Sequence, residues 1–238
     1  MIFGRFKSFW TSFWMRFAGL SRAGRVAMWL ATWFVPPFSG RCILARMNKR
    51  GYVSWSATVY HNNLILGDNI FIGDRVIIYK DSEGGPVELG KRVHLYGDTC
   101  IQTGQGGSLT IGENTHIQPN CQFSAYKGSI HIGKEVQIAP HCAFYPYDHS
   151  FSAGELIARQ PLTTKGGIVV GDGAWLGFGV IVLDGVRIGK GAVVGAGAVV
   201  SRDIPDGAVA AGAPAQVIKM RSDLTKLQKS SSKNTNPQ

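Results

Sequence analysis

Apolar residues recur every six positions through the middle of this chain, in six groups of three. A period of six matches neither the alternation of a β-strand nor the 3.6-residue turn of an α-helix. It matches a short strand followed by a corner, and three such units form one triangular coil of 18 residues around a shared core. We therefore predict an all-β solenoid of about six triangular coils. The apolar positions are Leu66, Ile72, Ile78; Leu89, Leu95, Ile101; Ile111, Ile117, Phe123; Ile132, Ile138, Phe144; Val170, Leu176, Val182; and Ile188, Val194, Val200.

Two small-residue columns support this register. Glycine follows the first apolar position of every triplet and never follows the third, which predicts that one corner is sharper or more crowded than the others. The position four residues after the middle apolar residue is a second inward candidate and is often small. The glycines are Gly67, Gly90, Gly112, Gly133, Gly171 and Gly189, and the second column reads Thr99, Cys121, Cys142, Val180 and Ala198.

Insertions into the period all follow the third unit of a coil, so one edge of the predicted prism should carry every loop. They cover residues 84–88, 107–110, 129–131 and 150–169. The last is by far the longest, and long loops in compact domains are often functional. The inserted loop 150–169 is thus the first indication of a site.

The chain before the period has a different pattern. Aromatic residues at helical spacing predict an amphipathic helical extension over residues 1–50, and Arg5, Lys7 and Arg16 flank the apolar stripe. Such a helix suits a membrane interface, which predicts peripheral membrane contact through residues 1–35. Alternatively, the stripe packs on the end of the solenoid as a cap, and both roles can hold. The stripe consists of Phe3, Phe6, Trp10, Phe13, Phe17 and Leu20.

Charge follows the same division. The net charge is +10, and residues 1–67 hold nine Lys or Arg and no acidic residue, which leaves 16 basic and 15 acidic residues for the rest. A nearly neutral β-helix domain, residues 51–221, argues against nucleic acid as a partner. The apolar stretch over 26–35 is too short to span a bilayer, and no signal-peptide cleavage site is evident. Residues 222–238 are polar and predict a flexible C-terminal tail.

Histidine and cysteine supply the candidate chemistry. His149 ends its six-residue unit where the long loop begins, and an imidazole can accept a proton near neutral pH. An exposed loop histidine is the alternative. His94 and His116 stack one coil apart, but no third metal ligand joins them, so we expect surface stacking and no metal. The four cysteines form neither a disulfide framework nor a zinc pattern. We expect Cys121 and Cys142, which occupy equivalent inward positions one coil apart, to be small core residues, which suits a reducing compartment.

Three stretches resemble the hexapeptide-repeat acyltransferases, whose fold is a left-handed parallel β-helix. The match is to the sugar O-acetyltransferase branch, which includes maltose and galactoside acetyltransferases and enzymes of surface-polysaccharide synthesis. The left hand of the coil is implied by this resemblance. The stretches run from Ile111 to Cys121, from Ile138 to His149, and from Val170 through Ser201-Arg202-Asp203-Ile204-Pro205 to Lys219.

The resemblance implies roles for individual residues. His149 matches the base that deprotonates the acceptor hydroxyl, Asn120 matches an amide near the oxyanion, and Glu155 could orient the His149 ring. For Asn120 a corner residue in Pro119-Asn120 is the alternative, and for Glu155 a solvated loop acid. The residues that match the acetyl-CoA groove are Trp175, Phe178, Ala196, Ser201, Arg202 and Lys219, with Arg221 adding charge.

The resemblance also implies a function. We expect an acetyl-CoA-dependent O-acetyltransferase that acts on a sugar hydroxyl in cell-surface or exopolysaccharide biosynthesis. A cytoplasmic homotrimer is expected, with sites between subunits. The chain departs from the family pattern at Ser150, at Ala125 and in its N-terminal segment, which leaves the acceptor open. Alternatives are N-acylation of an amino sugar or nucleotide-sugar, a metal-dependent protein of the carbonic anhydrase type, and a scaffold without activity.

Overall fold

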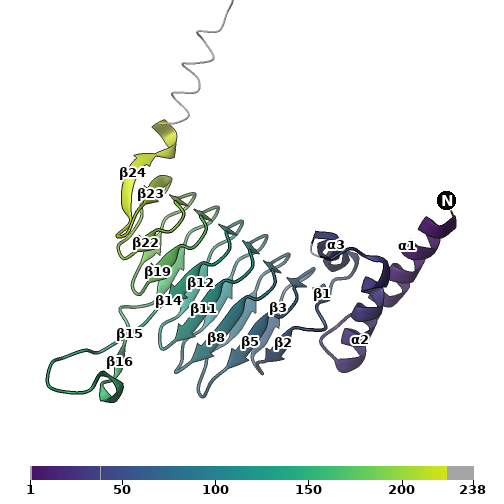
Figure 1. The fold of residues 1–238 in the computed structure, drawn as a ribbon, viewed down its shortest axis with the longest axis horizontal. Helices are drawn as coiled ribbons and strands as arrows, with labels where there is room; N and C mark the ends of the chain where they lie inside the picture. The colour runs from purple at the N-terminus through teal and green to yellow at the C-terminus, as the bar shows by residue number, and fades with distance from the viewer. Residues whose placement is uncertain (1, 38, 224–238) are drawn as a thin grey trace, which may run out of the picture.

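The computed structural model describes residues 2–37 and 39–223 and shows a triangular solenoid with helices at one end (Figure 1). Three sheets of parallel strands form the three faces of the prism. The solenoid has about seven turns and is consistent with the predicted left-handed β-helix. The first face contains β1 (Tyr52–Val53), β4 (Phe71–Ile72), β7 (His94–Leu95), β10 (His116–Ile117), β13 (Gln137–Ile138), β18 (Trp175–Leu176), β21 (Val193–Val194), β23 (Ala208–Ala211) and the antiparallel β24 (Gln216–Met220).

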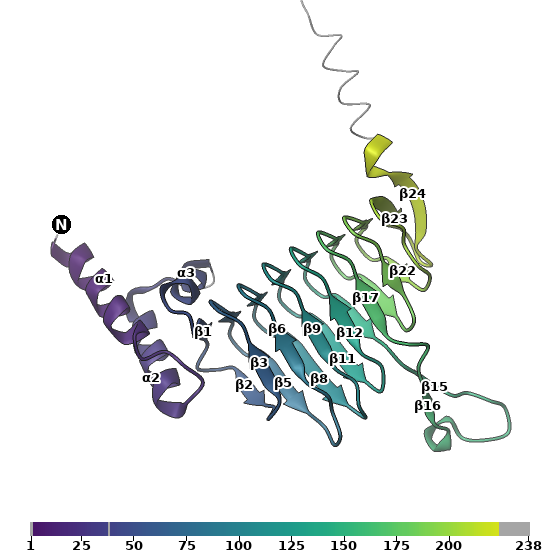
Figure 2. The same ribbon diagram turned by 180° about the vertical axis from the view of Figure 1, so that it is seen from behind.

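The other two faces follow the same stacking order, and Figure 2 shows the third face from behind. The second face contains β2 (Thr58–Tyr60), β5 (Ile77–Lys80), β8 (Cys100–Gly104), β11 (Gln122–Tyr126), β14 (Ala143–Tyr145), β19 (Ile181–Leu183) and β22 (Val199–Val200). The third contains β3 (Leu64–Leu66), β6 (Val87–Leu89), β9 (Leu109–Ile111), β12 (Ile130–Ile132), β17 (Ile168–Val170) and β20 (Arg187–Ile188).

The predicted period is confirmed, because every apolar position except the half-buried Leu66 is buried. The solenoid also extends beyond the period at both ends. Val53 lies one turn before Ile72 and pairs with it in register. Ala210 lies one turn after Val194 and pairs with it in the same way. Irregular spacing at the first turn and a small alanine at the last conceal these positions in the sequence.

The glycine column marks crowding between coils. A Cβ on Gly112 would lie 2.6 Å from the carbonyl carbon of Gly133, and one on Gly171 would lie 2.6 Å from the Lys190 nitrogen. Neither glycine has a positive φ. Close approach of the next coil, rather than a left-handed turn, therefore excludes side chains here.

The core is continuous along the prism. The rings of Phe123 and Phe144 stack with centroids 4.6 Å apart on adjacent turns. Cys121 and Cys142 are each 1% exposed in the predicted small column, which confirms them as core residues. Hydrogen bonding with Cys142 and burial raise the pKa of the Cys121 thiol, so it stays protonated.

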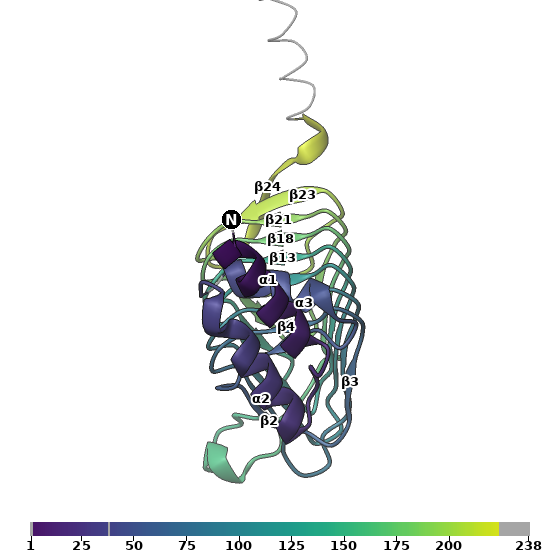
Figure 3. The same cartoon turned by 90° about the vertical axis from the view of Figure 1, so that its right-hand side faces the viewer.

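Helices cover the N-terminal end of the prism (Figure 3). They are α1 (Ile2–Met15), α2 (Arg22–Ala31), the 3-10 helix η1 (Thr32–Phe34) and α3 (Ser39–Met47). Met15, Met28 and Leu44 join the solenoid core, so the helices do cap it. The prediction that the aromatic stripe packs on the solenoid is wrong, however, because Phe6, Phe13 and Phe17 are exposed. The side chain of Phe3 and the predicted tail from residue 224 lie outside the described residues.

The long insertion forms an arm that projects from the prism (Figures 1 and 2). Its base is an antiparallel hairpin of β15 (Asp148–His149) and β16 (Leu162–Thr163). The arm ends earlier than predicted, because Ile168 and Val169 already pair with β12 in the third face. It leaves the solenoid at the edge that carries the other insertions, as the period predicted.

Candidate active site

His149 lies at the base of the arm, where its backbone is held in place. It pairs with Leu162 across the hairpin, and the Ser150 nitrogen donates to the Pro161 carbonyl at 3.0 Å. Farther out, the buried Gln160 amide closes the arm by donating to the Ser152 carbonyl at 2.9 Å and accepting from the Ser152 nitrogen at 2.8 Å. The His149 side chain is exposed, so an ordered backbone presents an accessible imidazole.

Glu155 is farther along the same arm. Its carbonyl accepts a hydrogen bond from the Gln160 side chain at 2.9 Å, while its side chain is exposed. Across the part of the chain that the structure describes, no hydrogen bond or ion pair joins the Glu155 carboxylate to His149. A single chain therefore does not bring this predicted pair together.

Asn120 occupies a different corner of the prism. It is exposed with a φ of 63°, and its nitrogen donates to the Gly97 carbonyl at 3.1 Å. Asparagine tolerates this left-handed conformation better than most residues, which accounts for its place in a turn. Asn120 precedes β11 and His149 follows β14, so they lie at opposite ends of neighbouring strands of the second face. Within one chain, the two predicted catalytic residues therefore lie apart.

The Asn120 corner continues toward the last turns. The His141 nitrogen donates to the Pro119 carbonyl, the Gly179 nitrogen to the Pro140 carbonyl, and the Gly197 nitrogen to the Phe178 carbonyl. His141 also lies against Phe178, with ring centroids 5.0 Å apart. Asn120 is therefore aligned with two predicted cofactor positions, Phe178 and Ala196. The sequence analysis missed His141, although it occupies the same corner position as Asn120.

All seven predicted cofactor residues are exposed on the last turns. Trp175 lies on the first face, and Lys219 lies on β24 at the end of that face, in register with Val209. Ser201 and Arg202 follow β22 at the loop-bearing edge. Within residues 2–37 and 39–223, neither Arg202 nor Lys219 forms an ion pair. Both cations are accessible to an anionic ligand. The exposed residues are Trp175, Phe178, Ala196, Ser201, Arg202, Lys219 and Arg221.

Tyrosines surround the base of the arm, and the sequence analysis did not single them out. Tyr147 lies two residues before His149, with its ring centroid 5.8 Å from Tyr126 and 6.3 Å from Tyr145. The Tyr147 hydroxyl lies 3.5 Å from the Ser124 hydroxyl. Burial and then neighbouring Tyr147 raise the pKa of Tyr145. The sequence feature that could have identified this cluster is that tyrosines occupy outward positions of the repeat close to His149.

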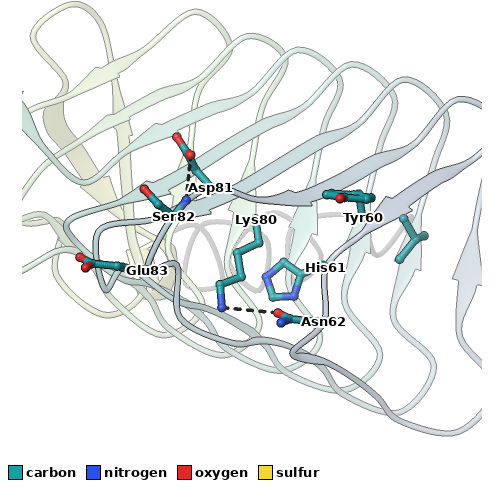
Figure 4. A pocket seen from close by; sticks show the side chains of 8 residues that line it. Tyr60, His61, Asn62, Lys80, Asp81, Ser82 and Glu83 are labelled. Atoms are coloured by element: carbon teal, nitrogen blue, oxygen red, sulfur yellow. Dashed lines mark hydrogen bonds between the residues drawn. The ribbon is translucent and has the colours of Figure 1, made fainter.

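The largest of four described cavities does not contain these residues. It has a volume of about 600 Å³ and lies on the first turns, at the edge that also carries the arm (Figure 4). His61 accepts or donates at 3.0 Å to the Thr103 hydroxyl, and Lys80 donates to the Asn62 side chain at 3.4 Å. Burial and then Lys80 lower the pKa of His61. None of these four cavities is lined by His149.

His94 and His116 stack with ring centroids 4.4 Å apart, but the predicted surface location is wrong, because His94 is buried and His116 is half-buried. His94 is only 4% exposed, and no described residue forms a hydrogen bond with its Nδ1. Burial, His116 and Arg46 lower the pKa of His94 to about 4. No group of three His, Cys, Asp or Glu side chains that could hold a metal occurs among the described residues.

The comparisons with known proteins agree with this fold. Residues 167–202 match the family described as bacterial transferase hexapeptide (six repeats), while no curated protein matches the chain. These residues carry the hexapeptide repeat of bacterial transferases, and the resemblance of the chain to the hexapeptide-repeat acyltransferases is confirmed.

Solved structures show the same architecture. The polySia specific acetyltransferase NeuO is 22% identical, with a TM-score of 0.58 over 78% of this chain and 89% of that one. AntD, an N-acyltransferase from Bacillus cereus in complex with dTDP and 3-hydroxybutyryl-CoA, is 20% identical, with a TM-score of 0.52 over 79% and 90%. At these identities the likeness concerns the fold alone.

A third structure is more similar in sequence over a shorter stretch. The hexapeptide-repeat acetyltransferase VCA0836 from Vibrio cholerae, complexed with acetyl coenzyme A, is 33% identical with a TM-score of 0.44. The alignment covers 47% of this chain and 60% of that one. This chain therefore spans about three fifths of that relative's length.

Proposed function

We propose that this protein is an acetyl-CoA-dependent O-acetyltransferase that acts on a sugar hydroxyl in surface-polysaccharide synthesis, in the cytoplasm where the donor is available. The observation that carries the proposal is the accessible imidazole of His149, held by an ordered arm on a hexapeptide-repeat solenoid. A histidine in this setting can accept a proton from a hydroxyl while that oxygen forms a bond to an acyl carbon.

The separation of His149 and Asn120 supports a site shared between chains. His149 is exposed at the base of the projecting arm, so a neighbouring copy could bring its Asn120 corner to this imidazole (Figure 1). A cyclic homotrimer repeats such a contact three times and closes. In this arrangement His149 would take the hydroxyl proton as the oxygen attacks the acyl carbon, and the Asn120 amide would donate to the carbonyl oxygen that becomes negative. The C–S bond of the thioester would then break, and the departing CoA sulfur would take the proton from His149.

The last turns fit the donor. Arg202 and Lys219 are exposed cations outside any ion pair of the described residues and could contact phosphates. Phe178 and Trp175 offer apolar surface to the pantetheine arm. Acetyl-CoA would supply the activated acyl group; the residues of this chain hold it, place the acceptor and move the proton.

Tyrosines at the base of the arm support a carbohydrate acceptor. Tyr126, Tyr145 and Tyr147 combine flat apolar rings with hydroxyl groups, which suits the alternating apolar and polar surfaces of a sugar. They lie within two residues of His149 or in ring contact with Tyr147. The acceptor hydroxyl would therefore be placed beside the base.

Product analysis against matched acceptors tests the proposal. The purified protein is incubated with acetyl-CoA and paired sugars that offer either free hydroxyls alone or a free amine. We expect CoA release with hydroxyl acceptors and an ester product that hydroxylamine cleaves. A hydroxylamine-resistant amide would instead identify an N-acyltransferase, and no CoA release with any glycan acceptor would contradict acyl transfer to sugars.

A further inference from the structure

We propose that the outward face of the N-terminal cap docks on an anionic lipid bilayer, with α1 lying in the plane of the interface. The inference concerns a surface far from the arm and does not depend on the proposed reaction. It rests on the direction in which the aromatic stripe points, on the charge around it, and on the length of the helices.

The stripe points away from the protein. Thr11 and Met15 are buried among the α1 residues whose side chains are described, and Phe13 lies two residues from each of them. Two residues turn an α-helix by about 200°, so Phe13 lies on the opposite face. Phe6 and Phe9 share this face, and Phe9 is 69% exposed. The protein thus caps its core with the face of α1 that carries Thr11 and Met15 and leaves the aromatic face exposed.

The next helix adds to the uncovered surface. Trp29 and Trp33 are exposed, with ring centroids 5.7 Å apart, and Val26 is also exposed. α1 and α2 together form the outer layer at this end of the molecule (Figure 3). Tryptophan and phenylalanine beside basic residues are typical of helices that insert their apolar face at the level of the lipid headgroups.

The positive charge of the N-terminal segment favours an anionic lipid surface as the partner. Residues 1–67 contain nine basic residues and no acidic one, although the rest of the chain is nearly balanced. Arg5 on α1, Arg16 directly after α1, and Arg22 on α2 are all exposed. Arg25 and Arg41, by contrast, hold the cap on the solenoid, the first through backbone carbonyls and the second through Asp74. The exposed arginines are therefore the ones that can meet lipid phosphates.

Helix length makes this an interfacial contact. No helix among the described residues is long and apolar enough to cross a membrane. α1 has 14 residues and is about 21 Å long, which suits a helix lying in the interface. Because Met15 belongs to the core, removing the segment would also uncap the solenoid, so point substitutions are the better test.

The test is co-sedimentation of the full chain with phosphatidylcholine vesicles that contain about one third phosphatidylglycerol, and with phosphatidylcholine alone. We expect binding to the anionic vesicles that decreases with added salt. The triple variant Phe9→Ser/Phe13→Ser/Phe17→Ser should partition at least about tenfold more weakly. The matched variant Tyr60→Ser/Ile65→Ser/Ile218→Ser removes exposed apolar side chains from the solenoid and should bind like the wild type.

Two charge variants distinguish electrostatic attraction to anionic lipid from nonspecific hydrophobic binding. Arg5→Gln/Arg16→Gln should weaken binding about 25-fold, or about fivefold per cation, while Lys91→Gln/Lys127→Gln should leave it unchanged. An unchanged melting temperature confirms that each variant folds. Absence of sedimentation with anionic vesicles would overturn the proposal. So would a lipid-free change of oligomeric mass in the aromatic triple variant, which would show that a second copy covers the stripe.

Discussion

The solenoid and its N-terminal cap contain the same kinds of apolar residue but place them in opposite ways. In the solenoid, Phe123 and Phe144 are fully buried and stack on each other between coils. In the cap, Phe9 and Phe13 on α1 are exposed and lie on the face opposite the core. Periodicity alone therefore does not say that an apolar stripe is a core: the solenoid stripes hold the fold together, while the cap stripe is left for something outside the chain.

The largest expected effect comes from removing one phenylalanine from each region. Phe144→Ala should lower the free energy of unfolding by about 3–5 kcal/mol, because it leaves a cavity beside Phe123. Phe9→Ala should change it by less than about 0.5 kcal/mol, since the side chain already contacts solvent. Chemical denaturation of both variants measures the difference. Similar losses for the two would mean that the stripe of α1 is part of the folding core.

The next largest effect is expected at acid pH, where protonation of His94 in the solenoid should lower the stability of the fold. Its pKa is lowered to about 4 in the folded protein, so the unfolded chain binds the proton more readily below pH 6.5. Stability is therefore fully present above about pH 6.5 and is lost toward pH 4, by up to about 3 kcal/mol. His94→Phe should flatten this dependence on pH. The exposed His131→Phe is its control, and equal slopes in both variants would contradict the assignment.

A smaller effect should follow from adding one methyl group in each region. Gly112→Ala places a Cβ 2.6 Å from the Gly133 backbone and should cost about 1–3 kcal/mol. Gly19→Ala, at the junction after α1, meets only the flexible Arg50 side chain at 3.7 Å and should be nearly neutral. Thermal melting compares them. A neutral Gly112→Ala would show that the coils can separate enough to admit a side chain.

Much of the solenoid could be predicted from the sequence because each coil repeats one physical requirement. Leu95 and Ile117 must point into the same core from the same face of the prism, so their spacing reports their location directly. The inward position of Cys121 and the crowding at Gly112 follow from the same register. Val53 was not predicted because the spacing of the repeat is irregular at the first turn. Ala210 was not predicted because a small alanine replaces the bulky apolar residue of the repeat.

The candidate site was harder to predict because its residues do not share a period. The position of His149 at the start of the arm was evident, but its distance from Asn120 depends on which corner each occupies. The clustering of Tyr126 with Tyr147 depends on how the arm leaves β14. The outward direction of Phe13 was also hidden, because a helix with two usable faces does not reveal from sequence which one packs.

The central claim is that the regular solenoid supports the reaction while the arm performs it, and a His149→Ala substitution tests this most directly. With the acceptor identified by the hydroxyl panel, steady-state turnover is measured together with acetyl-CoA binding; His131→Ala is the matched exposed histidine. We predict that His149→Ala lowers kcat about 10²–10⁴-fold while binding of acetyl-CoA is unchanged, and that His131→Ala behaves like the wild type. Activity of His149→Ala within about tenfold of the wild type would contradict the account, because general-base loss costs more than that.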